Sequence, residues 1–252
     1  MAQNITKDDL TIVYYTSNYL DDANPYFLEN TKRQLVKAIG DLPLIVVSQK
    51  PVTRFEGFTG EFTNICLGNI GRSHLNLYKQ ILIGCQNAKT KWVAMAEDDI
   101  LYSWEHFHHY LPPNKKFAYD MNKVSIFTWT KPPMFSFRTK RRVVNALISR
   151  RDYLVEALEE RFNHFPDPSK IDLSKWGDPG RYEALLGVTP RESEEFYSTC
   201  PNIVFTHENA FGYLNHGKRK RLGDLRIIEL AQWGRAEDIL KLYYEEGKGF
   251  QN

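Results

Sequence analysis

The stretch WVAMAEDDILYS, residues 92–103, places three consecutive carboxylates, Glu97, Asp98 and Asp99, between two apolar segments. Residues 91–96 have the apolar character of a buried strand, and an unpaired carboxylate inside a sheet is strongly unfavourable. In open α/β sheets, ligands bind where the carboxyl ends of the strands open into a crevice. We therefore expect the triplet at that edge, either hydrated or bound to a cation.

The segments before the triplet predict an α/β fold. LTIVYY (10–15) and LPLIVVSQ (42–49) have the composition of strands, and residues 25–39 between them are helix-like. A strand, a helix and a strand joined by short links predict a βαβ unit, with parallel pairing in a covered sheet. Residues 52–71 are rich in Gly, Thr and Asn, which indicates a loop, and a helix capped by Ser73 is expected after it.

The second half of the chain is less regular. Strands are expected at 124–129 and 143–149 and a helix at 151–162. A final strand beginning near 202, a loop with several glycines and a surface helix near the C-terminus are expected to follow. There is no internal repeat, low-complexity tract or clear linker. One domain spanning residues 1–252 is the simplest organisation.

Composition limits the class of protein. The chain has 252 residues, 42% of them hydrophobic, which is enough for a substantial core, and a formal net charge of +2. No apolar run approaches the roughly 18 residues of a membrane span, and the N-terminus is too polar for a signal peptide. A cytoplasmic protein is therefore expected. The three cysteines, Cys66, Cys85 and Cys200, form no C-x-x-C pair, which argues against a disulfide framework or a cysteine zinc site.

The acidic triplet has the chemistry of a cation site. Glu97 and Asp99 lie two residues apart, so in an extended backbone both side chains point to one face. Carboxylate oxygens suit Mg²⁺ or Mn²⁺, which complete their shells with water and substrate phosphates. His216, Gly217 and Lys218, late in the chain, add a potential metal ligand, a close backbone approach and a phosphate partner. An acidic surface turn remains the alternative.

Two segments carry a resemblance to a known family. YKQILIGCQNAKTKWVAMAEDDILYSWEHF (78–107) resembles the signature region of GT-A type nucleotide-sugar glycosyltransferases, especially the small ones of bacteriophages and bacteria, and NHGK (215–218) resembles their late H-G-K motif. The resemblance covers residues 10–130 well and 203–223 moderately. It implies a Rossmann-like mixed sheet flanked by helices, with a nucleotide-sugar-binding part at 1–130 and an irregular acceptor-binding part at 131–252.

The resemblance also implies residue roles around a UDP-sugar donor. Asp99 and His216 would bind Mn²⁺ or Mg²⁺, Glu97 would bind the ribose or join the metal's shell, and Lys218 would contact the diphosphate. The remaining residues expected at the nucleotide are Thr16, Ser17, Asn18, Arg72 and Asp98. The triplet departs from the usual D-x-D by beginning with Glu97, which puts the ribose contact in doubt more than the metal.

An inverting transferase also needs a general base for the acceptor hydroxyl. The candidates are Asp178 in WGDPGRYE, Glu183 after it, and Glu208 in THENAF. Asp178 is favoured because its loop, rich in glycine and proline, could place it at the cleft. A retaining enzyme would need no such base.

The expected acceptor is a 5-hydroxymethylated pyrimidine in phage duplex DNA, because related phage enzymes glycosylate such bases. Basic clusters at 140–142 and 218–221 could neutralise phosphates, and Trp129, Phe135 and Phe137 could stack on a flipped base. A surface-glycan or lipid-linked acceptor is the alternative within the family. A metal-dependent nuclease and a non-catalytic DNA-binding protein are the alternatives from other classes.

Overall fold

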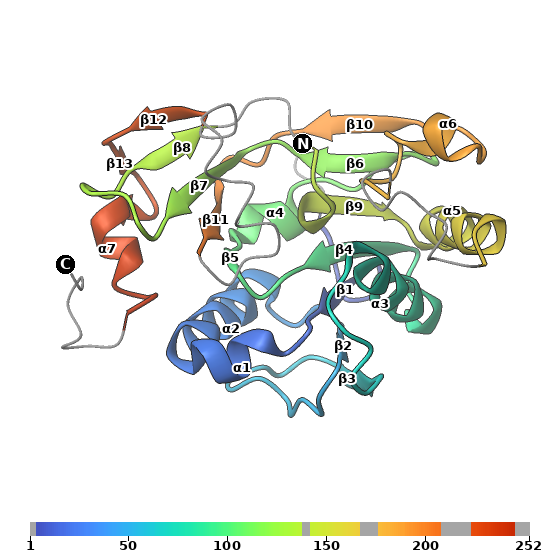
Figure 1. Ribbon diagram of the computed structural model, residues 1–252, viewed down its shortest axis with the longest axis horizontal. Helices are drawn as coiled ribbons and strands as arrows, with labels where there is room; N and C mark the ends of the chain where they lie inside the picture. The colour runs from blue at the N-terminus through green and yellow to red at the C-terminus, as the bar shows by residue number, and fades with distance from the viewer. Residues whose placement is uncertain (1–3, 138–141, 167–175, 208–222, 245–252) are drawn as a thin grey trace.

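Two β-sheets form the framework of the computed structural model, which describes residues 4–137, 142–166, 176–207 and 223–244 (Figure 1). The strands are β1 (Leu10–Tyr15), β2 (Leu44–Ser48), β3 (Phe62–Cys66), β4 (Trp92–Ala96), β5 (Ile100–Leu101), β6 (Phe117–Asp120), β7 (Lys123–Phe127), β8 (Phe135–Phe137), β9 (Leu147–Arg150), β10 (Ser193–Phe196), β11 (Asn202–Thr206), β12 (Asp224–Arg226), β13 (Glu229–Leu230) and β14 (Gly234–Arg235). The helices are α1 (Tyr19–Ala23), α2 (Pro25–Ile39), α3 (His74–Asn87), α4 (Trp104–His108), α5 (Arg151–His164), α6 (Glu183–Leu186), α7 (Ala236–Leu240) and the 3₁₀ turn η1 (Val144–Ala146).

The larger sheet is mixed. Its seven strands lie in the order β10-β6-β9-β4-β1-β2-β3. Only β9 runs against its neighbours β4 and β6, whereas the other adjacent pairs are parallel. The parallel pairing of β1 with β2 confirms the predicted βαβ unit, and the sheet with its flanking helices confirms the predicted fold class.

The two faces of this sheet are buried under different helices. On one face, Ile12 of β1 and Ala94 of β4 belong to a core cluster with Leu35 of α2 and with α4. On the other face, Val13 and Met95 belong to a cluster with α3 and α5. Side chains alternate between the faces of a strand, so a strand covered on both sides is buried at every position and mostly apolar. This explains why LTIVYY shows no polar alternation. Its one threonine, Thr11, shares a hydrogen bond with Thr90 Oγ1 at 2.7 Å.

The smaller sheet has five strands in the order β12-β8-β7-β11-β5. One of its faces is apolar: Val124 and Ile126 of β7 and Ile203 of β11 join a third core cluster, which includes Phe27 of α2 and Ile239 of α7. Lys123 and Ser125, which alternate with Val124 and Ile126 along β7, are only partly buried. Figure 1 shows β7 and β11 beside the end of β4 from which the acidic triplet emerges.

Two segments differ from the sequence-based prediction. Residues 52–71 were expected to be a loop but include the edge strand β3, which has no apolar run because its burial is only partial. Polar contacts help to hold it, since the Asn64 amide donates to Val46 O at 3.0 Å and to Ser48 Oγ at 2.8 Å. Residues 143–149 were expected to be one strand, but the chain turns through η1 before β9 begins. Within the described parts of the chain, no helix combines the length and apolar character needed to cross a membrane.

The packing of α3 on the sheet generates a stability prediction. A Cβ built on Gly84 would clash with Val13 and lie 3.1 Å from Val47 Cγ2. Gly84→Ala should therefore lower the free energy of unfolding by about 1–3 kcal/mol, although alanine is a better helix former than glycine by about 1 kcal/mol. Urea unfolding measures the change, with Lys79→Ala on the exposed side of α3 as the control. A more stable Gly84→Ala variant would contradict close packing at this point.

Candidate active site

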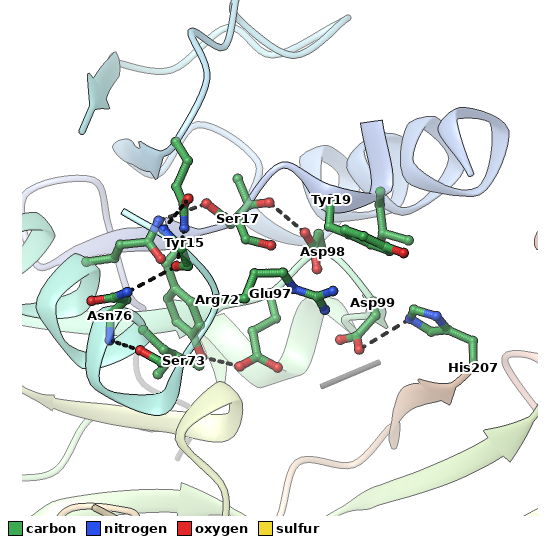
Figure 2. Close-up of a pocket in the computed structure, with 16 residues that line it drawn as sticks. Tyr15, Ser17, Tyr19, Arg72, Ser73, Asn76, Glu97, Asp98, Asp99 and His207 are labelled. Carbon is green, nitrogen blue, oxygen red and sulfur yellow. Dashed lines mark hydrogen bonds and ion pairs between the residues drawn. The ribbon is translucent and has the colours of Figure 1, made fainter. Parts of the chain in front are cut away.

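The acidic triplet lies where β1 and β4 end side by side. Tyr15, the last residue of β1, donates its hydroxyl to Glu97 Oε1 at 2.6 Å, and Thr16 Oγ1 donates to Asp98 Oδ2 at 2.6 Å. Figure 2 shows the contacts between these two strand ends. The alternation of β4 continues into the triplet, because Glu97 follows the α3 side of the sheet and Asp98 the α2 side, where Thr31 Oγ1 donates to Asp98 O at 2.9 Å.

Glu97 is held by donors on both carboxylate oxygens. Tyr15 binds Oε1, and Asn145 Nδ2 of η1 donates to Oε2 at 2.8 Å. The Tyr102 hydroxyl ties the same backbone segments together, since it accepts from Glu97 N at 3.1 Å and donates to Asn145 O at 2.9 Å. Glu97 is therefore fixed in orientation before any substrate binds.

The triplet concentrates negative charge in a partly buried place. Burial, followed by repulsion from Asp99, raises the pKa of Glu97 to about 8. The same two causes raise the pKa of Asp98 to about 6, against the stabilising hydrogen bond from Thr16. Both shifts mean that the ionised forms are disfavoured, and a bound cation would offset that cost.

Asp99 faces His207 across the gap between the two sheets. His207 Nε2 lies 3.7 Å from Asp99 Oδ2 (Figure 2). Phe205 N donates to Asp99 O at 3.0 Å, which fixes the two backbone segments against each other. Our sequence reasoning did not select His207. Its position directly after the apolar segment NIVF and Thr206 was the available signal, because it ends a strand as the triplet does.

A first cleft opens beside the triplet, above the ends of β1 and β2. Its lining includes the predicted nucleotide residues Thr16, Ser17 and Arg72 as well as Glu97, Asp98, Asp99 and His207. At its edge, the Arg72 guanidinium lies 4.1 Å from the centre of the Tyr19 ring. The structure thus brings together four separate segments of the chain, at residues 16–19, 72, 97–99 and 207.

Asn18 lies below this cleft and is buried. It adopts a left-handed conformation with φ of 58°, and its Oδ1 accepts hydrogen bonds from Gln49 N at 2.8 Å and Lys50 N at 2.9 Å. Its side chain therefore joins the loops after β1 and β2. Asn18 is not among the residues that line this cleft, and its described contacts shape the lining. The nucleotide contact expected for Asn18 stays a prediction.

A second cleft lies on the other side of the triplet. Lys123 and Ser125 of β7 and Thr206 of β11 line it, facing away from the apolar core of the smaller sheet, and Asn145 and Asp178 complete its polar lining. Glu97 and Asp99 line both clefts. The two clefts therefore meet at two carboxylates of the triplet.

The residues predicted as general bases have different surroundings. Asp178 lines the second cleft, and its Oδ1 accepts from Val144 N at 2.8 Å. Glu183 is buried in an ion pair with Arg161 and also accepts from Gly180 N at 2.8 Å. Glu183 lines neither of these clefts, and its described contacts are structural. The base role expected for it stays a prediction. Glu208, His216 and Lys218 lie outside the described residues.

The aromatic residues expected to stack on a DNA base are also separated. Phe135 is fully buried in the core of the smaller sheet, so a stacking role for it is wrong. Phe137 lies under the guanidinium of Arg226, 5.2 Å from the ring centre, and Trp129 is 39% exposed. Of the two basic clusters, only Arg142 lies in the described residues, where it forms an ion pair with Glu195.

The donor set of the triplet fits a hard divalent cation. Among the residues that the structure describes, no group of three or more His, Cys, Asp or Glu side chains is arranged around one metal position. Asp99 and His207 nevertheless offer one oxygen and one nitrogen within 3.7 Å of each other. Mg²⁺ and Mn²⁺ are commonly held by one or two side chains, with waters and substrate phosphates as the other ligands.

The chain was compared with known proteins. No family model and no curated protein matches it. Solved structures with a similar fold include the glycosyltransferase GlyE of Streptococcus pneumoniae TIGR4, with a TM-score of 0.44, 9% identity, and coverage of 74% of this chain and 45% of that one. A glycosyltransferase involved in glycosylation of the major capsid of PBCV-1 has a TM-score of 0.41 and 12% identity, with coverage of 75% of this chain and 82% of that one. The nucleotidyl transferase Mth528 of Methanothermobacter thermautotroptrophicus has a TM-score of 0.37 and 12% identity, with coverage of 60% of this chain and 76% of that one. The chain thus spans less than half of GlyE, and these similarities concern the general fold alone.

Proposed function

We propose that this protein is a metal-dependent glycosyltransferase, which moves a sugar from a nucleotide-sugar to an acceptor hydroxyl. The observation that carries the proposal is the meeting of two clefts at Glu97 and Asp99. A group-transfer enzyme must hold a donor and an acceptor on opposite sides of the reacting bond. A protein that only binds DNA has no need of such a junction.

The first cleft is proposed as the donor site, with a UDP-sugar as the predicted donor. Asp99 and His207 would hold Mn²⁺ or Mg²⁺ between them. When bound, the cation supplies electrostatic stabilisation of the negative charge on the departing diphosphate. Arg72, at the edge of the same cleft, is a second positive group within reach of an anionic donor. His216 and Lys218 stay predictions for the same end of the donor.

The second cleft is proposed as the acceptor site. Lys123, Ser125 and Thr206 present an amine and two hydroxyls to it, and these groups can orient an acceptor by hydrogen bonds. A hydroxymethylated pyrimidine in DNA stays the prediction from sequence. Among the described residues, the DNA acceptor is supported only by the exposed Trp129, because Phe135 is buried. Most residues of the two basic clusters lie outside the described ranges.

The donor site can be tested through thermal stability. Mn²⁺ together with the correct nucleoside diphosphate should raise the melting temperature, since a ligand at 100 times its Kd stabilises the folded state by about 2.7 kcal/mol. Asp99→Ala should abolish this stabilisation, because it removes the carboxylate proposed to hold the cation. Differential scanning fluorimetry with a panel of nucleoside diphosphates measures both effects.

Glu237→Ala, on the exposed side of α7, is the matched control and should keep the full stabilisation. A wild-type protein that ignores every nucleotide, yet cleaves DNA when metal alone is added, would replace the glycosyltransferase by the nuclease alternative.

A metal-binding role for His207 has its own test. If the imidazole is a ligand, His207→Ala should weaken Mn²⁺ binding at least about tenfold, since even partners of metal ligands cost 10–100-fold when removed. Electron paramagnetic resonance of free Mn²⁺ measures the affinity without any turnover. The exposed His164 provides the control substitution, His164→Ala, which should leave the affinity unchanged. Equal Mn²⁺ affinity in all three proteins would exclude His207 from the metal shell.

A further inference from the structure

The carboxylate of Asp178 is engaged with the backbone of η1. Its Oδ1 accepts the N–H of Val144, the first residue of that turn, at 2.8 Å. The first N–H groups of a helical turn have no acceptor within the turn, and a side-chain carboxylate commonly supplies one. Asp178 therefore fixes the start of the short segment that runs along the second cleft.

The next residue of that turn holds the acidic triplet. Asn145 Nδ2 donates to Glu97 Oε2 at 2.8 Å, and Asn145 O accepts from the Tyr102 hydroxyl at 2.9 Å. Val144 and Asn145 are adjacent, so a shift of the Val144 backbone must displace the Asn145 amide. Glu97 would then lose the donor that holds one of its two carboxyl oxygens, and a partly buried polar group that loses a hydrogen bond is less well fixed in orientation.

The loop that carries Asp178 is itself anchored on both sides of that residue. Before it, Gly177 O accepts from Arg161 Nη1 at 2.8 Å. After it, Pro179 O accepts from the Tyr119 hydroxyl at 2.6 Å, and Gly180 N donates to Glu183. The buried ion pair of Arg161 with Glu183 thus holds the loop from both ends.

We propose that Asp178 is a positioning residue, which acts through Val144 and Asn145 to hold Glu97 at the junction of the two clefts. The inference rests on the proposed function, since Glu97 is taken to lie at the reacting groups. In this proposal Asp178 and Glu183 both act on the position of the same loop. Glu183 and Arg161 fix the loop, and Asp178 links the loop to η1.

The positioning role and the general-base role of Asp178 predict different magnitudes. A general base contributes about 10²–10⁴-fold to the rate, and its replacement by any group that cannot take a proton removes that factor. Loss of a hydrogen-bonding partner that orients an active-site group costs about 10–100-fold. An asparagine in place of Asp178 keeps an oxygen that can accept from Val144 N but takes no proton.

The test compares Asp178→Asn, Asp178→Ala and Asn145→Ala. We expect Asp178→Asn to keep kcat for nucleotide-sugar turnover within about threefold of wild type, and each alanine variant to lose about 10–100-fold in kcat with KM for the donor little changed. The double variant of Asp178→Ala with Asn145→Ala should be no slower than the slower single variant, because both break the same connection.

A second measurement needs no turnover. Hydrogen exchange of the Val144 amide should be slow in wild type and in Asp178→Asn. It should be at least tenfold faster in Asp178→Ala, because the alanine removes the acceptor of the Val144 N–H. Asp152→Ala is the matched control, since Asp152 Oδ1 accepts from Tyr153 N at 2.9 Å at the start of α5, away from both clefts. It removes a comparable backbone contact and should leave kcat and Val144 exchange unchanged.

Each other result overturns the inference. If Asp178→Asn is as slow as Asp178→Ala, Asp178 is the general base. If both alanine variants keep the wild-type kcat, the connection has no part in the reaction. If wild type turns over no nucleotide-sugar, the proposed function fails and the catalytic half of the inference fails with it. Val144 exchange that is as slow in Asp178→Ala as in wild type would separately show that the carboxylate does not hold the turn.

Discussion

The structure depends on one electrostatic constraint: three consecutive carboxylates must be satisfied at the end of a buried strand of a mixed sheet. β1 meets part of this need, because its last residues reach Glu97 and Asp98 through the hydroxyls of Tyr15 and Thr16. η1 meets another part through Asn145. The raised pKa values of Glu97 and Asp98 show that these donors offset only some of the cost of burial and mutual repulsion. A cation at the proposed Asp99 site would offset part of the remaining cost.

The constraint also explains why two sheets are needed. The triplet ends a strand of the larger sheet, but its last member is held by the backbone of β11 in the smaller sheet, where Phe205 N donates to Asp99 O. β11 then brings His207 to within 3.7 Å of the Asp99 carboxylate. The strand alternation of the smaller sheet places Val124 and Ile126 in the core and turns Lys123 and Ser125 toward the triplet. One sheet therefore supplies the charge and the other supplies a polar wall opposite it.

Much of the first half of the fold could be predicted from the sequence, because its signals are local. The apolar run of residues 10–15 and the helix of residues 25–39 match β1 and α2, and Ser73 caps α3 by accepting from Asn76 N at 3.0 Å. β3 escaped prediction because an edge strand needs no apolar run and owes part of its stability to hydrogen bonds from a single side chain, that of Asn64. Such bonds depend on residues 16–18 positions away, which periodicity does not report.

The site, like the fold, could be predicted only where its signals are local. The triplet could be found because a carboxylate cluster after an apolar strand is unusual in itself. The roles of Asn145 and Asp178 depend on contacts with residues 48 and 34 positions away. A sequence shows that an aspartate is present but not whether its oxygens face a substrate or a backbone N–H. The described contacts of Glu183 are structural, because its partner Arg161 is as buried as the carboxylate itself. Removing either partner of such a pair leaves an uncompensated charge in the core, so residues that look catalytic in sequence can be indispensable to a site without touching its substrate.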